Sequence, residues 1–123
     1  MIVDLAELKV HLRVEPDEHA EDSAIEGYGL AAEARVMQWL GRPVYATLDT
    51  MPLVGQPGYD PYQIVADQAI KVAIMQLVAR MHGPDREGSG TATEDAVPPR
   101  SVRDLLSGYR VFHRIIDLVP EAP

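Results

Sequence analysis

Apolar residues recur at helical spacing in the first part of this chain. Between residues 4 and 12 the three leucines fall on one face of a helix. Asp4 precedes this stripe, and Glu7 lies three residues after Asp4, which is the spacing of a capping box. Pro16 disfavours helix at the residue before it. We therefore predict a short amphipathic helix over residues 4–12, followed by a break.

A longer helix is predicted from residue 18 to residue 40. Its apolar positions recur every three or four residues: Ile25, Tyr28, Ala32, Val36, Trp39 and Leu40. Acids crowd its first turns, as the helix dipole prefers. Gly41 and Pro43 predict its end. Gly27 and Gly29 each cost about 0.5–1 kcal/mol relative to alanine inside a helix. They either weaken its middle or let another backbone come close.

The central part of the chain predicts a loop and then a buried helix. Residues 44–59 include two prolines and two glycines without a lasting period, and no pattern supports a strand there. Asp60, Pro61 and Gln63 have the residue types expected at N-cap, N1 and N3 of a helix. Residues 69–81 are apolar almost all round, which is typical of a helix buried on most sides. We therefore predict a core helix that begins after Asp60.

The last part of the chain combines a polar stretch with a compact basic segment. Residues 85–96 are small and polar, and they predict a mobile loop. In "VPPRSVRDLLSGYRVF", residues 97–112, Pro99 suits N1 of a short helix that runs through Leu106, and Gly108 suits its C′ position. Its buried stripe comprises Val102, Leu105 and Leu106. The residues that follow are expected to extend as a strand or arm, and 113–123 as a C-terminal tail.

These elements predict a mostly α-helical protein that forms a single domain over residues 1–123. In this small helical domain a long acidic helix packs on a buried central helix. A short C-terminal helix and an extended arm complete it.

Charge is distributed unevenly along the 123 residues, whose formal net charge is −8. Residues 15–34 hold seven acids and no lysine or arginine, whereas residues 100–114 hold four arginines and one acid. Two solvated faces would explain this pattern. Alternatively, the two regions attract opposite ends of neighbouring molecules. The residues predicted for a subunit or portal interface are Glu21, Asp22, Arg100, Arg103, Tyr109, Arg110, Val111 and Phe112.

The residue types offer little for catalysis. The chain has no cysteine, so thiolate chemistry and disulfides are excluded. Its four histidines show no helical zinc spacing, and His19 lies in an acidic stretch expected to be solvated. No glycine-rich phosphate loop is present. We expect that the protein is not an enzyme and that it binds no cofactor and no metal. We also expect no signal peptide and no membrane span.

Five stretches follow one another in a distinctive order: "DLAELKVHLRV", "EPDEHAEDSAIE", "VMQWLGRPV", "QAIKVAIMQLVARMHG" and "VPPRSVRDLLSGYRVF". This series resembles the head–tail connector, or adaptor, family of long-tailed double-stranded DNA phages and prophages. The resemblance extends from residue 1 to about residue 112. The chain departs from the family at Gly27 and Gly29, where members carry larger apolar residues, and in its tail beyond Phe112.

The resemblance implies a mostly helical structural protein of the virion, located in the host cytoplasm during assembly. It implies a ring of about a dozen subunits that docks under the portal, extends the DNA channel and provides the platform for the next neck protein. DNA would pass through without sequence-specific binding, and no cofactor is needed. The alternative is a small DNA-binding regulatory protein that uses the arginines of residues 100–114.

Overall fold

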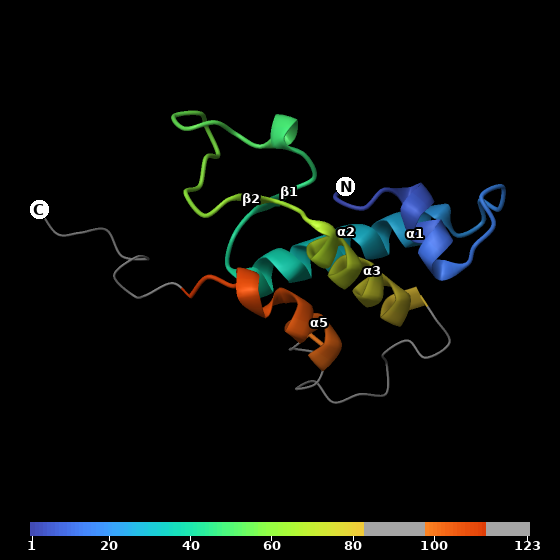
Figure 1. Cartoon of the computed structure of the whole chain (residues 1–123). Helices are drawn as coiled ribbons and strands as arrows, with labels where there is room; N and C mark the ends of the chain where they lie inside the picture. Colours follow the sequence, from blue (N-terminus) through green and yellow to red (C-terminus); the bar gives the residue numbers. More distant parts are fainter. Residues whose placement is uncertain (83–97, 113–123) are drawn as a thin grey trace, which may run out of the picture.

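The computed structural model describes residues 1–82 and 98–112, in which the helices pack against one another and one loop projects from them (Figure 1). Of the described residues 57% are helical and 4% lie in strands, so the predicted mostly α fold is confirmed. The first helix, α1 (Leu5–Leu12), begins where the capping pattern predicts. The Asp4 carboxylate accepts a hydrogen bond of 2.9 Å from the Glu7 backbone N–H. The predicted polar loop, 85–96, and the tail, 113–123, lie outside the described residues.

The core lies where α2 (Asp22–Leu40) and α3 (Gln68–His82) pack along each other, with α1 against both and α5 (Arg100–Leu106) against α3. Figure 1 shows α3 between α2 and α5. Side chains from all four helices are buried together, among them Leu8, Ile25, Val36, Leu40, Ile70, Ala73, Ile74, Leu77, Val78, Val102 and Leu106. The predicted pairing of a long acidic helix with a buried central helix is therefore present.

The long helix begins four residues later than the pattern predicts. Its first residue is Asp22, because the preceding residues form turns in which the Glu18 N–H donates to the Glu15 carbonyl at 3.0 Å. Its end matches the prediction. Gly41 has a φ of 71°, and its N–H donates to the Met37 carbonyl at 2.9 Å. That left-handed conformation favours glycine.

At Gly29 in α2 the close approach comes from side chains and not from another backbone. A Cβ at Gly29 would lie 3.0 Å from the Leu8 side chain and 3.2 Å from the Met1 sulfur, whereas a Cβ at Gly27 would meet no heavy atom within 4 Å. Gly29 is buried and Leu8 is fully enclosed, so a larger residue at position 29 would require the ends of the Leu8 and Met1 side chains to shift by a few tenths of an ångström. Gly27 only lowers the helix propensity of an exposed position.

The predicted start of the central helix at Asp60 is wrong. Strand β1 (Val44–Tyr45) pairs in parallel with β2 (Ile64–Val65), and α3 follows only after this pairing. Asp60 instead closes an exposed turn, in which its carboxylate accepts from the Tyr62 N–H at 2.8 Å. Asp67 occupies the capping position, because its carboxylate accepts from the Ile70 N–H at 3.0 Å. Helix α3 is described as far as His82.

Exchanging each of these two aspartates for alanine separates the two roles. Asp67→Ala is expected to lower the free energy of unfolding by about 0.5–2 kcal/mol, the usual cost of losing an N-cap. Asp60→Ala removes one hydrogen bond from an exposed turn, so we expect a smaller loss. Urea unfolding followed by circular dichroism measures both variants. If Asp60→Ala lowers the free energy of unfolding more than Asp67→Ala does, the assignment of Asp67 as the N-cap of α3 is wrong.

The C-terminal helix is close to its prediction. In α5 the side chains of Val102 and Leu106 are buried and that of Leu105 is half-buried. Pro99 occupies the N-cap position instead of the predicted N1 position, so the helix begins one residue later, at Arg100. Gly108 is not a C′ residue, because a 3-10 turn, η2 (Ser107–Tyr109), continues directly from the helix. Beyond η2, Arg110 has an extended backbone, which begins the predicted arm.

Candidate functional site

The last described residues attach to the C-terminal end of α2. The Val111 N–H donates to the Leu40 carbonyl at 2.7 Å, and Arg110 Nε donates to the Trp39 carbonyl at 2.9 Å. Carbonyls in the last turn of a helix lack intrahelical partners, and a cation there interacts favourably with the helix dipole. These contacts therefore satisfy the end of α2 while they hold the segment in place.

Arg42 ties the projecting loop to the same end of α2. Its Nε donates to the Tyr62 carbonyl at 2.6 Å and its Nη1 to the Tyr109 carbonyl at 3.1 Å. One guanidinium thus joins residues that are 47 positions apart in the sequence. The planar fork of arginine suits such simultaneous donation.

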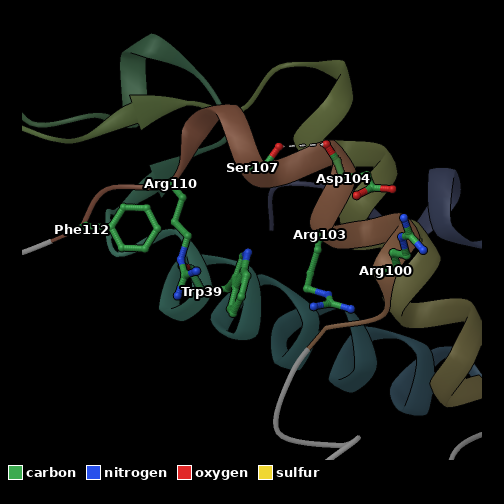
Figure 2. Close-up of a pocket in the computed structure, with 7 residues that line it drawn as sticks. All are labelled: Trp39, Arg100, Arg103, Asp104, Ser107, Arg110 and Phe112. Carbon is green, nitrogen blue, oxygen red and sulfur yellow. Dashed lines mark hydrogen bonds between the residues drawn. The ribbon is translucent and has the colours of Figure 1, made fainter.

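The Arg110 guanidinium lies between two aromatic rings. Its Cζ is 3.6 Å from the centroid of the Trp39 ring and 4.6 Å from that of the Phe112 ring. Figure 2 shows this stack, with Trp39 on α2 and Phe112 on the extended segment. Cation–π contacts of this kind contribute about 0.5–1 kcal/mol each at exposed sites. Phe112 is 74% exposed, so much of this stack faces solvent.

Beside the stack lies an open groove of about 590 Å³, which we call the basic groove. The groove is formed by residues from α2, α5 and the extended segment: Trp39, Arg100, Arg103, Asp104, Ser107, Arg110 and Phe112. Figure 2 shows Arg100 and Arg103 on α5, on the side away from Phe112. Both side chains are exposed, and within residues 1–82 and 98–112 neither forms an ion pair. Three arginines and a single acid give the groove a positive potential.

Tyr109 connects the segment to the start of α3. Its hydroxyl donates to the Asp67 carboxylate, the same group that caps α3. This hydrogen bond lowers the pKa of Asp67 and raises the pKa of Tyr109 above its ordinary value of 10.0. Because the pKa of Tyr109 is raised in the folded protein, ionisation of this tyrosine leaves the stability of the fold unaffected below pH 10.0. The stabilisation from the contact is lost as the pH rises through the raised pKa.

The predicted acidic partners lie at the other end of α2 and are already engaged within the chain. Lys9 Nζ is 2.8 Å from Asp22 Oδ1, and His19 Nδ1 is 2.8 Å from Asp22 Oδ2. The hydrogen bond from Lys9, with a further one from His19, lowers the pKa of Asp22. Glu21 Oε2 is 3.1 Å from His82 Nε2. The structure therefore brings the predicted residues together as two separate groups, one at each end of α2.

Two buried charged residues are absent from the predicted set. The Lys9 side chain is 5% exposed, and besides its ion pair it donates to the Pro16 and Glu18 carbonyls. Glu33 is also buried, and its carboxylate accepts from the Ile2 N–H at 3.0 Å. The sequence does carry a signal for both: each is a charged residue at helical spacing within an apolar stripe.

The described residues present charged and aromatic surfaces. Within 1–82 and 98–112, no group of three or more potential metal ligands comes together. In the same ranges, no helix has both the length and the apolar character needed to cross a membrane. What the fold presents is an ordered helical body with a basic, aromatic surface at one end and an acidic surface at the other. These features define the class as a mostly helical protein with surfaces suited to contacts.

Sequence comparison identifies the family within this class. Residues 2–110 match the family described as phage gp6-like head-tail connector protein, and the chain belongs to that family. No curated protein and no solved structure matches the chain significantly. The family consists of structural phage proteins of the head–tail junction and is not known as a family of enzymes.

Proposed function

We propose that this protein forms a ring of about a dozen copies under the portal of the filled phage head. The ring extends the DNA channel and provides the platform on which the next neck protein assembles. The family match over residues 2–110 carries this proposal, because it includes every helix that the structure describes.

The projecting loop between β1 and β2 supports a role in protein contacts. Leu48, Leu53 and Val54 lie on this loop and are 67%, 67% and 80% exposed. Figure 1 shows the loop extending away from the helices. Large apolar side chains that cluster on an exposed loop are typical of protein–protein interaction sites. We assign this loop to contacts with the portal or the neck protein.

The charge of the chain supports passage of DNA rather than its retention. Tight binding to duplex DNA requires the neutralisation of several phosphates by lysine and arginine. The formal net charge of −8 opposes such binding. An acidic channel wall would let DNA slide through the ring.

Electron microscopy of the purified protein, alone and with the portal protein of the same phage, tests the proposal. We expect closed rings with a central hole, or rings seated on the portal. Binding of duplex DNA is measured in parallel by fluorescence anisotropy at low and high salt. A protein that stays monomeric with and without the portal, but binds DNA in a salt-dependent way, would instead be the small DNA-binding regulator.

A further inference from the structure

We infer that the basic groove of one copy receives the acidic loop, residues 15–18, of the next copy in the ring. The acidic loop consists of Glu15, Pro16, Asp17 and Glu18, which connect α1 to α2. This inference rests on the proposed ring and specifies the surfaces that hold it together.

The two surfaces lie at opposite ends of one rigid element. The acidic loop precedes the first residue of α2, Asp22, and the basic groove includes Trp39 in its last turn. A helix of 19 residues spans roughly 28 Å at 1.5 Å per residue. Two different, complementary patches on opposite sides of a molecule produce a head-to-tail interface, which closes into a ring when the rotation between copies permits.

At this end of the molecule the loop residues form a group of acids available to a partner. Glu15, Asp17 and Glu18 are exposed, and their carboxylates have no ion pair within the described ranges. Glu21 and Asp22 are paired with His82 and Lys9. Residues 15–18 therefore offer three carboxylates without an internal ion pair to a neighbouring molecule, and they are a different set from the one the sequence predicts.

The basic groove matches the loop in charge and in availability. Arg100 and Arg103 are exposed and unpaired within the described ranges, while Arg110 is fixed by its two aromatic neighbours. Three carboxylates on the loop would thus meet three guanidinium groups, which bind carboxylates through paired N–H donors. The exposed face of Phe112 provides apolar area next to them, which Pro16 can cover.

The acidic loop is ordered before any partner arrives. Lys9 Nζ donates to the carbonyls of Pro16 and Glu18, so the backbone is held from inside while the three carboxylates point to solvent. A loop that is already in its bound conformation loses little conformational entropy on binding. The buried lysine thus has a role in the interface, although it does not touch the partner.

Two complementary double variants test this pairing. The groove variant carries Arg100→Glu and Arg103→Glu, and the loop variant carries Asp17→Arg and Glu18→Arg. Each exchanges attraction for repulsion, so we expect either one alone to self-associate about tenfold more weakly than the parent, or worse. A control variant with Glu7→Arg, Ala31→Arg and Ala34→Arg has the same charge change as the loop variant at exposed sites elsewhere, and it should assemble at least as well as the parent.

An equal mixture of the two variants gives the decisive measurement. The groove variant keeps its acidic loop and the loop variant keeps its basic groove. In the alternating order, an acidic loop meets a basic groove at one contact and a basic loop meets an acidic groove at the next. Sedimentation velocity should therefore show assembly in the mixture and little in either protein alone. Raising the salt concentration from about 0.05 M to about 0.5 M should weaken the self-association of the parent, because interactions between exposed charges are screened over roughly 10 Å or less.

The outcomes separate this inference from the proposed function. If the parent forms rings and the double variants form them equally well, the groove–loop contact is wrong and the ring stands. The groove–loop contact is also wrong, and the ring also stands, if neither variant assembles alone and their mixture does not assemble either. Groove and loop would then bind different partners. If the parent remains monomeric alone and with the portal, both the ring and its interface are wrong. Circular dichroism of each variant shows that the fold is retained.

Discussion

Ala73→Asp is expected to leave the protein largely unfolded at neutral pH. Ala73 is completely buried in the middle of α3, among apolar side chains from the other helices. An unpaired carboxylate there costs more than about 5 kcal/mol, a large part of the roughly 5–15 kcal/mol that stabilises a typical domain. Circular dichroism and the fluorescence of Trp39 should both show loss of the native state.

The matched control is Ala31→Asp, the same substitution at an exposed position of α2. We expect its melting temperature to lie close to that of the parent, because the new carboxylate stays in water. An Ala73→Asp protein that melts together with this control would show that α3 is not the buried centre of the fold.

Lys9→Met is expected to have the next largest effect. The substitution keeps the length of the side chain and removes its charge. It leaves the Pro16 and Glu18 carbonyls without their donor and Asp22 without its cation. Losing hydrogen bonds from a charged donor costs about 1.5–3 kcal/mol, which urea unfolding at neutral pH measures. The other lysine, Lys71, serves as a control, because Lys71→Met removes a half-buried ammonium that has no ion pair within the described ranges.

The same variant should respond differently to acid. Lys9 and His19 hold the pKa of Asp22 below its ordinary value of 3.8. A carboxyl group with a lowered pKa in the folded state contributes stability above pH 3.8, and this contribution is lost as the pH falls through the lowered value. In Lys9→Met the pKa of Asp22 should rise toward 3.8, so stability should fall less steeply with acid than in the parent. Equal slopes below pH 3.8 in the two proteins would contradict the pairing of Lys9 with Asp22.

Local signals in the sequence predicted the elements whose ends depend only on near neighbours. The Asp4 cap, the Gly41 terminus and the buried stripe of α5 each involve groups within about one helical turn of one another. The uncapped start of α2 shows the limit of such signals. The carbonyl of Glu18, the residue at which the helix was predicted to begin, accepts a hydrogen bond from Lys9 Nζ, which is a contact between α1 and the loop that follows it.

The start of α3 shows why composition alone cannot choose between two capping sites. Asp60 and Asp67 have the same side chain, and the Pro61 and Gln63 that follow Asp60 make it the better local match. Pairing of Val44–Tyr45 with Ile64–Val65 decides the matter, because residues in a strand ladder cannot also be helical. A strand pair of two residues has no detectable period, so sequence periodicity could not reveal it.

The candidate site was predicted in part. The sequence shows the contrast between an acidic region and a basic segment, and exposed residues of both regions lie on the surface of the structure. Which acids remain available was decided by tertiary contacts, since His82 reaches Glu21 from 61 positions away. The same holds for the basic groove, in which Arg110 and Trp39 meet across 71 positions.

The sequence by itself determined that this is a small, mostly helical, acidic protein, because helical periodicity, caps and charge are properties of neighbouring residues. Its membership of the phage head–tail connector family follows from the similarity of residues 2–110 to that family. The tertiary structure alone decided where α3 begins, why Lys9 and Glu33 are buried, and which charges face outward. Those outcomes depend on contacts between distant segments. Each such contact must offset the cost of desolvating a polar group, and only the packed fold brings its partner within hydrogen-bonding distance.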